Sequence, residues 1–225
     1  MNAHTQAGET FFIFTCAVRQ IASMFRRVSD VFQNKHTQGD LQRLKQLLTE
    51  VTGKVHTDKE VSLLNLACGR ADETAVLAEV FGKNGIDITG MDIRDRELDI
   101  ARDRWKKLLQ GNAKAQFHVQ NGTQLDTLKQ LHDSFDIVFM RHQNYWNGDS
   151  TWEKIYDQAL HRLNDDGLMV ITSYFDREHS LAIEALQSLG AKMVTNVRNG
   201  KSRVLMDSIG KSVDRHVAVF RKPST

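Results

Sequence analysis

A turn of small residues and a single aspartate are the features of this sequence that could do chemistry. The turn, Ala67-Cys68-Gly69-Arg70-Ala71, follows the apolar run 61–66 and precedes residues with helical periodicity. A second apolar run, 86–91, stops at Asp92. In a parallel sheet these strand ends lie side by side, so the turn offers bare backbone while Asp92 can accept two hydrogen bonds from a ribose diol. The pattern therefore predicts a nucleoside pocket.

The charge at the start of the following helix indicates which class of nucleoside cofactor the pocket would bind. A dinucleotide fingerprint would have its third glycine at position 72 and a pyrophosphate on the helix N-terminus. The sequence has Asp72 and Glu73 there, and two carboxylates would repel a diphosphate. A cofactor with a ribose and no phosphate fits better. S-adenosylmethionine (SAM), built from an adenosine, a sulfonium and an amino acid end, is such a cofactor.

Two segments resemble the class I SAM-dependent methyltransferases. The stretch 64–72, Leu-Asn-Leu-Ala-Cys-Gly-Arg-Ala-Asp, is similar to their first motif, and 90–101 is similar to their acidic second strand and the helix after it. The resemblance covers 61–222 and implies an α/β fold: a three-layer Rossmann-like sandwich with a seven-stranded, mostly parallel sheet whose last strand is antiparallel. It also implies SAM as the methyl donor and S-adenosylhomocysteine as the product.

The same resemblance assigns roles to the first two strand ends. Gly69 would let the backbone pass close to the methionine end of SAM. Asp92 would accept both ribose hydroxyls, and Ile93 would lie against the adenine. The family usually has an acid at the position of Asn65, which could still orient the turn or the ammonium group of the cofactor. Arg70 could reach either the methionine carboxylate or solvent.

The third and fourth strand ends complete the predicted site. In the family, an acid at the position of Asn121 takes the adenine amino group, and the next backbone N–H, here that of Gly122, reaches a ring nitrogen. Met140 and Arg141 fall where the family lines the methionine end. His142 is a candidate catalytic base, because an imidazole titrates near working pH, and a hydrogen-bonded loop histidine is the alternative. Two aromatic residues that follow could stack on a substrate, hold a cation or simply pack: Tyr145 and Trp146.

Apolar periodicity predicts strands that alternate with helices, which favours a parallel sheet. We expect a helical cap segment over 1–56 and a methyltransferase domain over 57–225. The cap would hold helices over 11–32 and 41–51, separated by a break at 37–40, and could form a homodimer contact. In the domain we expect strands at 61–66, 86–91, 114–120, 135–140, 168–174, 192–198 and 216–221, a short extra strand at 203–206, and helices through residues 75–81, 98–108, 125–131, 152–163 and 182–189.

Composition bears on partners and compartment. The net charge of +2 conceals a split, because residues 57–189 hold 15 basic and 22 acidic side chains whereas 190–225 hold 8 basic and 2 acidic. The basic region could bind RNA or be a solvated edge. Two cysteines make no disulfide framework, which favours the cytoplasm. The apolar run 11–18 is too short to span a bilayer, and the histidines and cysteines show no metal-ligand spacing.

We therefore predict a SAM-dependent methyltransferase that acts on a small-molecule acceptor. Two alternatives remain open. One is methylation of RNA or protein through the basic C-terminal region. The other is a non-catalytic protein that retains the fold, since residues untypical of the family stand at four positions of the site: Asn65, Ala67, Ala71 and Asn121.

Overall fold

The computed structural model describes residues 35–53, 59–108, 111–128, 131–132 and 134–223 of the 225-residue chain. The chain divides into two units, residues 1–40 and 41–225. Of the first unit, residues 35–40 are described and all are helical, so the predicted break at 37–40 is wrong. A lone glycine costs a helix only about 1 kcal/mol, and no proline accompanies Gly39. The predicted helix 11–32 lies outside the described residues, and the homodimer contact and the division at residue 56 stay predictions.

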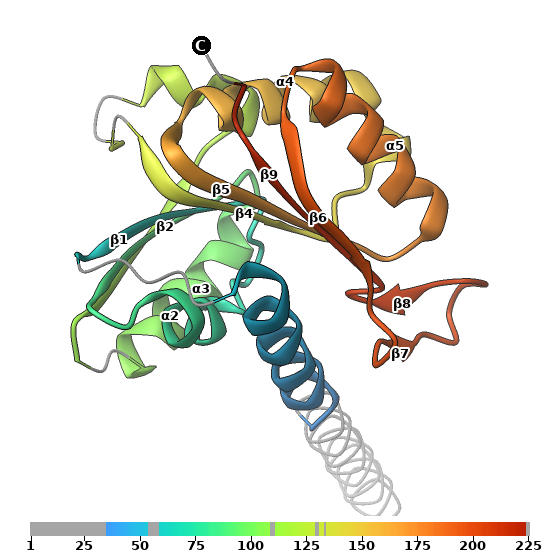
Figure 1. Ribbon diagram of the computed structural model, residues 1–225. Coiled ribbons are helices and arrows are strands. Elements are labelled where there is room, and N and C mark those ends of the chain that lie inside the picture. Colours follow the sequence, from blue (N-terminus) through green and yellow to red (C-terminus); the bar gives the residue numbers. More distant parts are fainter. Residues whose placement is uncertain (1–34, 54–58, 109–110, 129–130, 133, 224–225) are drawn as a thin grey trace, which may run out of the picture. The chain divides into compact units, whose positions relative to one another are not determined.

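The second unit contains the predicted seven-stranded sheet, in the order β3-β2-β1-β4-β5-β9-β6 (Figure 1). Neighbouring strands from β3 to β5 are parallel, whereas β9 is antiparallel to both β5 and β6. The predicted fold class is thereby confirmed. The strands are β1 (Val61–Leu66), β2 (Ile86–Asp92), β3 (Ala113–Val119), β4 (Phe135–Arg141), β5 (Leu163–Ser173), β6 (Lys192–Arg198) and β9 (His216–Arg221).

Helices cover both faces of this sheet (Figure 1). Residues 41–52, α2 and α3 pack on one face, and α4 and α5 pack on the other. Both faces are therefore buried, which explains why the central strands are almost wholly apolar. None of the helices in the described part of the chain is both long and apolar enough to cross a membrane. The helices are α2 (Thr74–Phe81), α3 (Asp95–Leu108), α4 (Asp149–His161) and α5 (Asp176–Ser188), with two 3-10 turns, η1 (Gly122–Thr127) and η2 (Tyr145–Asn147).

The register of the sheet brings three strand ends together. Leu66, the last residue of β1, pairs with Met91 of β2 on one side and with Met140 of β4 on the other. The strand order reverses between β1 and β4, and the crevice at such a reversal is where ligands bind in open α/β sheets. The loops that follow β1, β2 and β4 therefore meet at one site.

Four predicted elements differ from the structure. The helix predicted over 182–189 is α5, which begins six residues earlier, at Asp176. β5 begins at Leu163, which pairs with Phe135, whereas the sequence placed that residue on a helix. Its side chain is buried either way, so burial periodicity does not distinguish the two. The helix predicted over 125–131 is the 3-10 turn η1, which ends at Thr127. The extra strand is β7 (Arg203–Val204), which pairs with β8 (Ser212–Val213) to form a separate two-stranded sheet.

Candidate active site

The turn after β1 is built from left-handed residues at alternate positions. Ala67, Gly69 and Ala71 have φ angles of 54°, 53° and 48°. A Cβ in this region costs about 1–2 kcal/mol, which explains why glycine is usual at all three positions in the resembled family. The N–H of Cys68 donates to the carbonyl oxygen of Met91 over 3.0 Å and so ties the turn to the end of β2. The turn therefore lies against the residue that precedes Asp92.

Asp92 faces this turn, and its side chain is 3% exposed. The Gly69 N–H donates to Oδ2 over 2.8 Å, and the backbone N–H of Arg94 donates to Oδ1 over 2.9 Å. The Arg94 guanidinium also donates to both oxygens, from Nε over 3.0 Å and from Nη2 over 3.1 Å. Burial acts to raise the pKa of Asp92, but the hydrogen bonds from Arg94 and Gly69 outweigh it and the pKa lies below its usual value. The group is thus a carboxylate at neutral pH.

A cavity of about 470 Å³ opens beside Asp92. Five of the predicted cofactor residues lie in or at this cavity, which has the size of a small-ligand pocket. Ile93 is 69% exposed, as expected of a side chain that would cover an adenine face. The predicted residues in its lining are Ala67, Asp92, Ile93, Asn121 and Gly122.

Further residues of the cavity lining were not predicted as cofactor contacts. They come from the loop after β4 and from α4, which contribute Asn144, Asn147, Thr151, Trp152 and Ile155. Trp152 and Ile155 belong to the helix predicted through residues 152–163, and the sequence holds no signal that this helix also borders a cavity.

Asn121 has a local role. Its Oδ1 accepts hydrogen bonds from the Thr123 N–H over 3.0 Å and from the Thr123 hydroxyl over 2.9 Å, and so caps η1. An amide oxygen has two lone pairs, so both are occupied. The predicted contact with an adenine amino group would require one of these bonds to open.

Six predicted cofactor residues lie outside the lining of the cavity: Asn65, Cys68, Gly69, Arg70, Met140 and Arg141. Cys68 and Met140 belong to the hydrophobic core, and burial, reinforced by Glu73 and Asp92, raises the pKa of the Cys68 thiol. Arg70 pairs with Glu97 over 2.7 Å. Asn65 is fully buried, and its Nδ2 donates to Glu73 over 2.7 Å.

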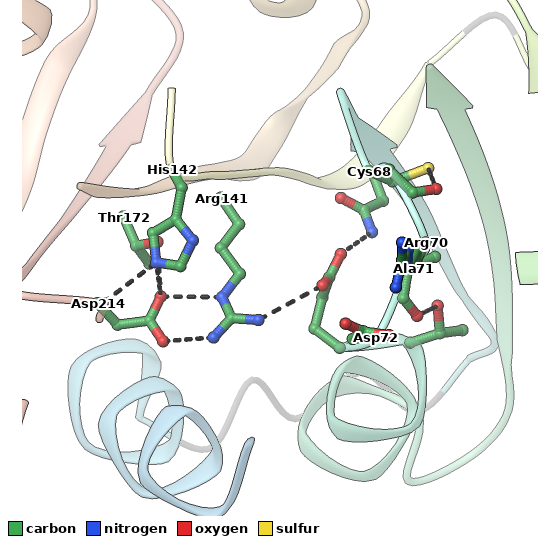
Figure 2. Close-up of polar contacts among 12 residues, drawn as sticks. Cys68, Arg70, Ala71, Asp72, Arg141, His142, Thr172 and Asp214 are labelled. Atoms are coloured by element: carbon green, nitrogen blue, oxygen red, sulfur yellow. Dashed lines mark hydrogen bonds and ion pairs between the residues drawn. The ribbon is translucent and has the colours of Figure 1, made fainter. Parts of the chain in front are cut away.

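Beside the end of β4, a buried network joins Arg141 and His142 to Asp214 (Figure 2). Arg141 donates to the two carboxylate oxygens of Asp214 over 2.9 and 2.6 Å, and the Thr172 hydroxyl donates to Oδ1 over 2.9 Å. Burial acts to raise the pKa of Asp214, but Arg141 and His142 outweigh it and hold the pKa well below its usual value. Arg141 also lies 3.6 Å from Glu73, which links the network to the start of α2.

His142 is held from two sides. Its Nε2 lies 2.8 Å from Asp214 Oδ1 and accepts the Asp214 backbone N–H over 3.1 Å. When Nε2 carries a proton, it donates a hydrogen bond to the Asp214 carboxylate. When Nε2 carries none, it accepts the hydrogen bond from the Asp214 backbone N–H. The ring stacks on Tyr174, with centroids 3.7 Å apart.

Asp214 was not predicted from the sequence, because it is remote from every motif. It lies between β8 and β9, 73 positions after Arg141 in the sequence. Its φ angle of 49° is left-handed, and His142 is left-handed too, at 60°. Aspartate is one of the residues that tolerate this conformation, but nothing in the local sequence links it to β4.

The fold and the crevice together define a Rossmann-like protein with a nucleoside-sized cavity at the reversal of strand order. A family model described as a methyltransferase domain matches residues 57–217. The chain belongs to this family, the class I SAM-dependent methyltransferases, and is a methyltransferase by class. A search of curated proteins finds no match to the sequence.

Solved structures agree on the fold. The chain is similar to an rRNA methylase from Streptococcus thermophilus, with 16% identity, a TM-score of 0.55, and 80% of this chain and 94% of that chain covered. It is also similar to the PH0226 protein from Pyrococcus horikoshii, with 13% identity, a TM-score of 0.61, and 82% and 90% covered. A precorrin-6y C5,15-methyltransferase from Geobacter metallireducens gives 17% identity, a TM-score of 0.54, and 80% and 88% covered.

Proposed function

We propose that this protein binds SAM with its adenosine in the cavity beside Asp92 and transfers the methyl group to a small-molecule acceptor. The observation that carries the proposal is the position of the Asp92 carboxylate, which lies at the edge of a cavity of about 470 Å³ and next to the bare backbone of Gly69. A ribose diol needs such an acceptor, and a nucleoside fits such a volume. The residues present therefore fit an adenosine.

The other predicted residues have separate roles in cofactor binding and proton transfer. Ile93 covers one face of the adenine, and Asn121 and Gly122 border the cavity where its polar edge would lie. When bound, SAM supplies a methyl group on a positively charged sulfur, which an acceptor nucleophile attacks in line. His142 lies at the end of β4, and Asp214 holds its Nε2. Where the acceptor has a proton to lose, His142 is the residue that we assign to take it.

We favour a small-molecule acceptor over RNA because of charge. Within the basic region 190–225, Lys211 pairs with Asp207 over 2.8 Å and Arg215 pairs with Asp176 over 2.7 Å. Paired cations release fewer counterions from a phosphate backbone, which weakens binding to RNA.

The low cysteine content favours the cytoplasm as the compartment.

Calorimetry with S-adenosylhomocysteine tests the cofactor site. We expect the wild-type protein to bind it and Asp92→Asn to bind it about a hundredfold more weakly, because the variant loses two charge-assisted hydrogen bonds to the ribose. The matched control is Asp87→Asn, on the same strand but outside the cavity lining, which should bind like the wild type.

Two outcomes would contradict the proposal. A folded wild-type protein that fails to bind S-adenosylhomocysteine has no cofactor site. Tight binding combined with no methyl transfer to any compound in a metabolite extract, followed with radiolabelled SAM, would overturn the small-molecule acceptor.

A further inference from the structure

The carboxylate of Asp92 is already saturated with hydrogen bonds. Two donors are backbone groups, the N–H of Gly69 and the N–H of Arg94. Two more belong to the Arg94 guanidinium, which donates through Nε to Oδ1 and through Nη2 to Oδ2. An ionised carboxylate offers about four lone-pair sites. A ribose that needs two of them must therefore displace two of the donors present.

The guanidinium is the group able to leave. The two backbone N–H groups are held by the turn after β1 and by the residues that join β2 to α3. In contrast, the Arg94 side chain is 60% exposed, so it can turn into solvent. Glu97, which pairs with Arg70, also attracts the Arg94 guanidinium electrostatically.

The guanidinium also covers the backbone that the cofactor would approach. A Cβ placed on Gly69 would come within 3.0 Å of Arg94 Nη2, so the charged group lies directly over this glycine. Arg94 belongs to the lining of the cavity as well. One side chain thus occupies both features that define the adenosine site, the carboxylate and the bare turn.

We propose that Arg94 sets the cofactor affinity of this site by competing with the ribose diol for Asp92, an inference that rests on the proposed function. A ligand with both hydroxyls binds only the molecules in which the guanidinium has turned away, so its affinity is reduced in proportion to their fraction. The Arg94–Asp92 ion pair is partly exposed. The free energy of such a pair corresponds to about a two- to fivefold reduction in the affinity for the cofactor.

Calorimetry with S-adenosylhomocysteine on arginine variants tests the competition. Arg94→Ala should bind about two- to fivefold more tightly than the wild type. Arg94→Lys should fall between the two, because an ammonium is a single point charge and lacks the fork that engages both oxygens. The control Arg96→Ala removes an exposed arginine from the first turn of α3 and should bind like the wild type.

A second pair of ligands isolates the ribose. Adenosine carries the diol, whereas 2′,3′-dideoxyadenosine lacks it and has no use for Asp92. Arg94→Ala should tighten binding of adenosine and leave binding of the dideoxy compound unchanged. An equal gain for both compounds would show that Arg94 merely obstructs the cavity, and weaker binding would make it a ligand contact. Either result overturns the competition.

Failure of this inference is distinguishable from failure of the proposed function. If the wild type binds S-adenosylhomocysteine and Arg94→Ala binds it no more tightly, the competition alone is overturned. If the wild type and every variant have the same circular dichroism and none binds S-adenosylhomocysteine, both are overturned.

Discussion

The two halves of the crevice differ in how they use polar side chains. On the β2 side, Asp92 borders an open cavity, and the cation that covers it is 60% exposed. On the β4 side, the side chains of Asp214 and Arg141 are 2% and 13% exposed, and the pair is locked by further bonds from His142 and Thr172. The first half is arranged so that a ligand can replace one of its own contacts. The second is arranged as a fixed frame.

This difference predicts where substitutions will act. Charges in the β4 half contribute to stability, because a buried ion that loses its partner is costly. Charges in the β2 half contribute to binding, because their present partners are exchangeable. The three predictions below would sharpen that division or break it.

The largest effect is expected from Asp214→Ala. This variant leaves Arg141 buried with only the more distant Glu73 for a counter-ion, and breaking a buried pair costs about 3–5 kcal/mol of unfolding free energy. Urea denaturation of the wild type and the variant measures this loss of unfolding free energy. Glu60→Ala, which breaks an ion pair with Lys114 in which both side chains are exposed, is the control and should cost about 1 kcal/mol or less.

Replacing both members of the buried pair gives a further check. The double variant Asp214→Ala, Arg141→Met should recover most of the loss, because an apolar replacement leaves no unpaired buried charge. A loss below about 1 kcal/mol in the single variant would show that the network does not act as a frame.

A smaller effect on stability, one that depends on pH, is expected from Glu178 at the start of α5. Burial raises the pKa of Glu178 to about 7, although the N–H of Tyr174 donates to it over 3.3 Å. Since the pKa is higher in the folded than in the unfolded protein, its contribution to stability is complete below the ordinary carboxyl pKa of 4.5 and is lost as pH rises through about 7. The wild-type protein should lose on the order of 2 kcal/mol across this window.

The glutamine variant tests this assignment. Glu178→Gln cannot ionise, so its unfolding free energy should vary less between pH 4.5 and 7 than that of the wild type. Parallel pH profiles for the two proteins, measured by thermal or urea unfolding, would mean that Glu178 is not the titrating group.

The smallest effect is expected at Asn121 in the β2 half. Asn121→Asp would keep the cap on Thr123 and add lone pairs for an adenine amino group, so S-adenosylhomocysteine should bind about fivefold more tightly at nearly unchanged stability. Asn121→Ala removes the cap without adding an acceptor and serves as the comparison. If Asn121→Asp changes stability more than affinity, the two halves are less distinct than proposed.

Much of the fold follows from local patterns. The predicted bounds of β1, β6 and β9 agree with the structure, because each is a short run of suitable residues between turn signals. Asp92 could be predicted for the same reason, since a strand end is a local feature. Leu163 could not be placed, because a buried leucine suits a helix and a strand equally.

The polar network has a different origin. Arg141 was predicted next to a bound cofactor, but its side chain is held by Asp214, which reaches it only after the sheet has brought distant segments together. The Arg94 guanidinium was not anticipated either, because its position depends on a side-chain conformation and not on spacing. Contacts of these two kinds become visible only in three dimensions.

The place of β9 in the sheet also constrains how the protein can be made. It lies between β5 and β6, yet it is translated after both. While the ribosome is still synthesising residues 216–221, β6 has no neighbour to pair with and β5 presents an open edge. The nascent chain must therefore delay closure of this side of the sheet, and chaperones that shield unpaired strand edges have their longest opportunity to act there.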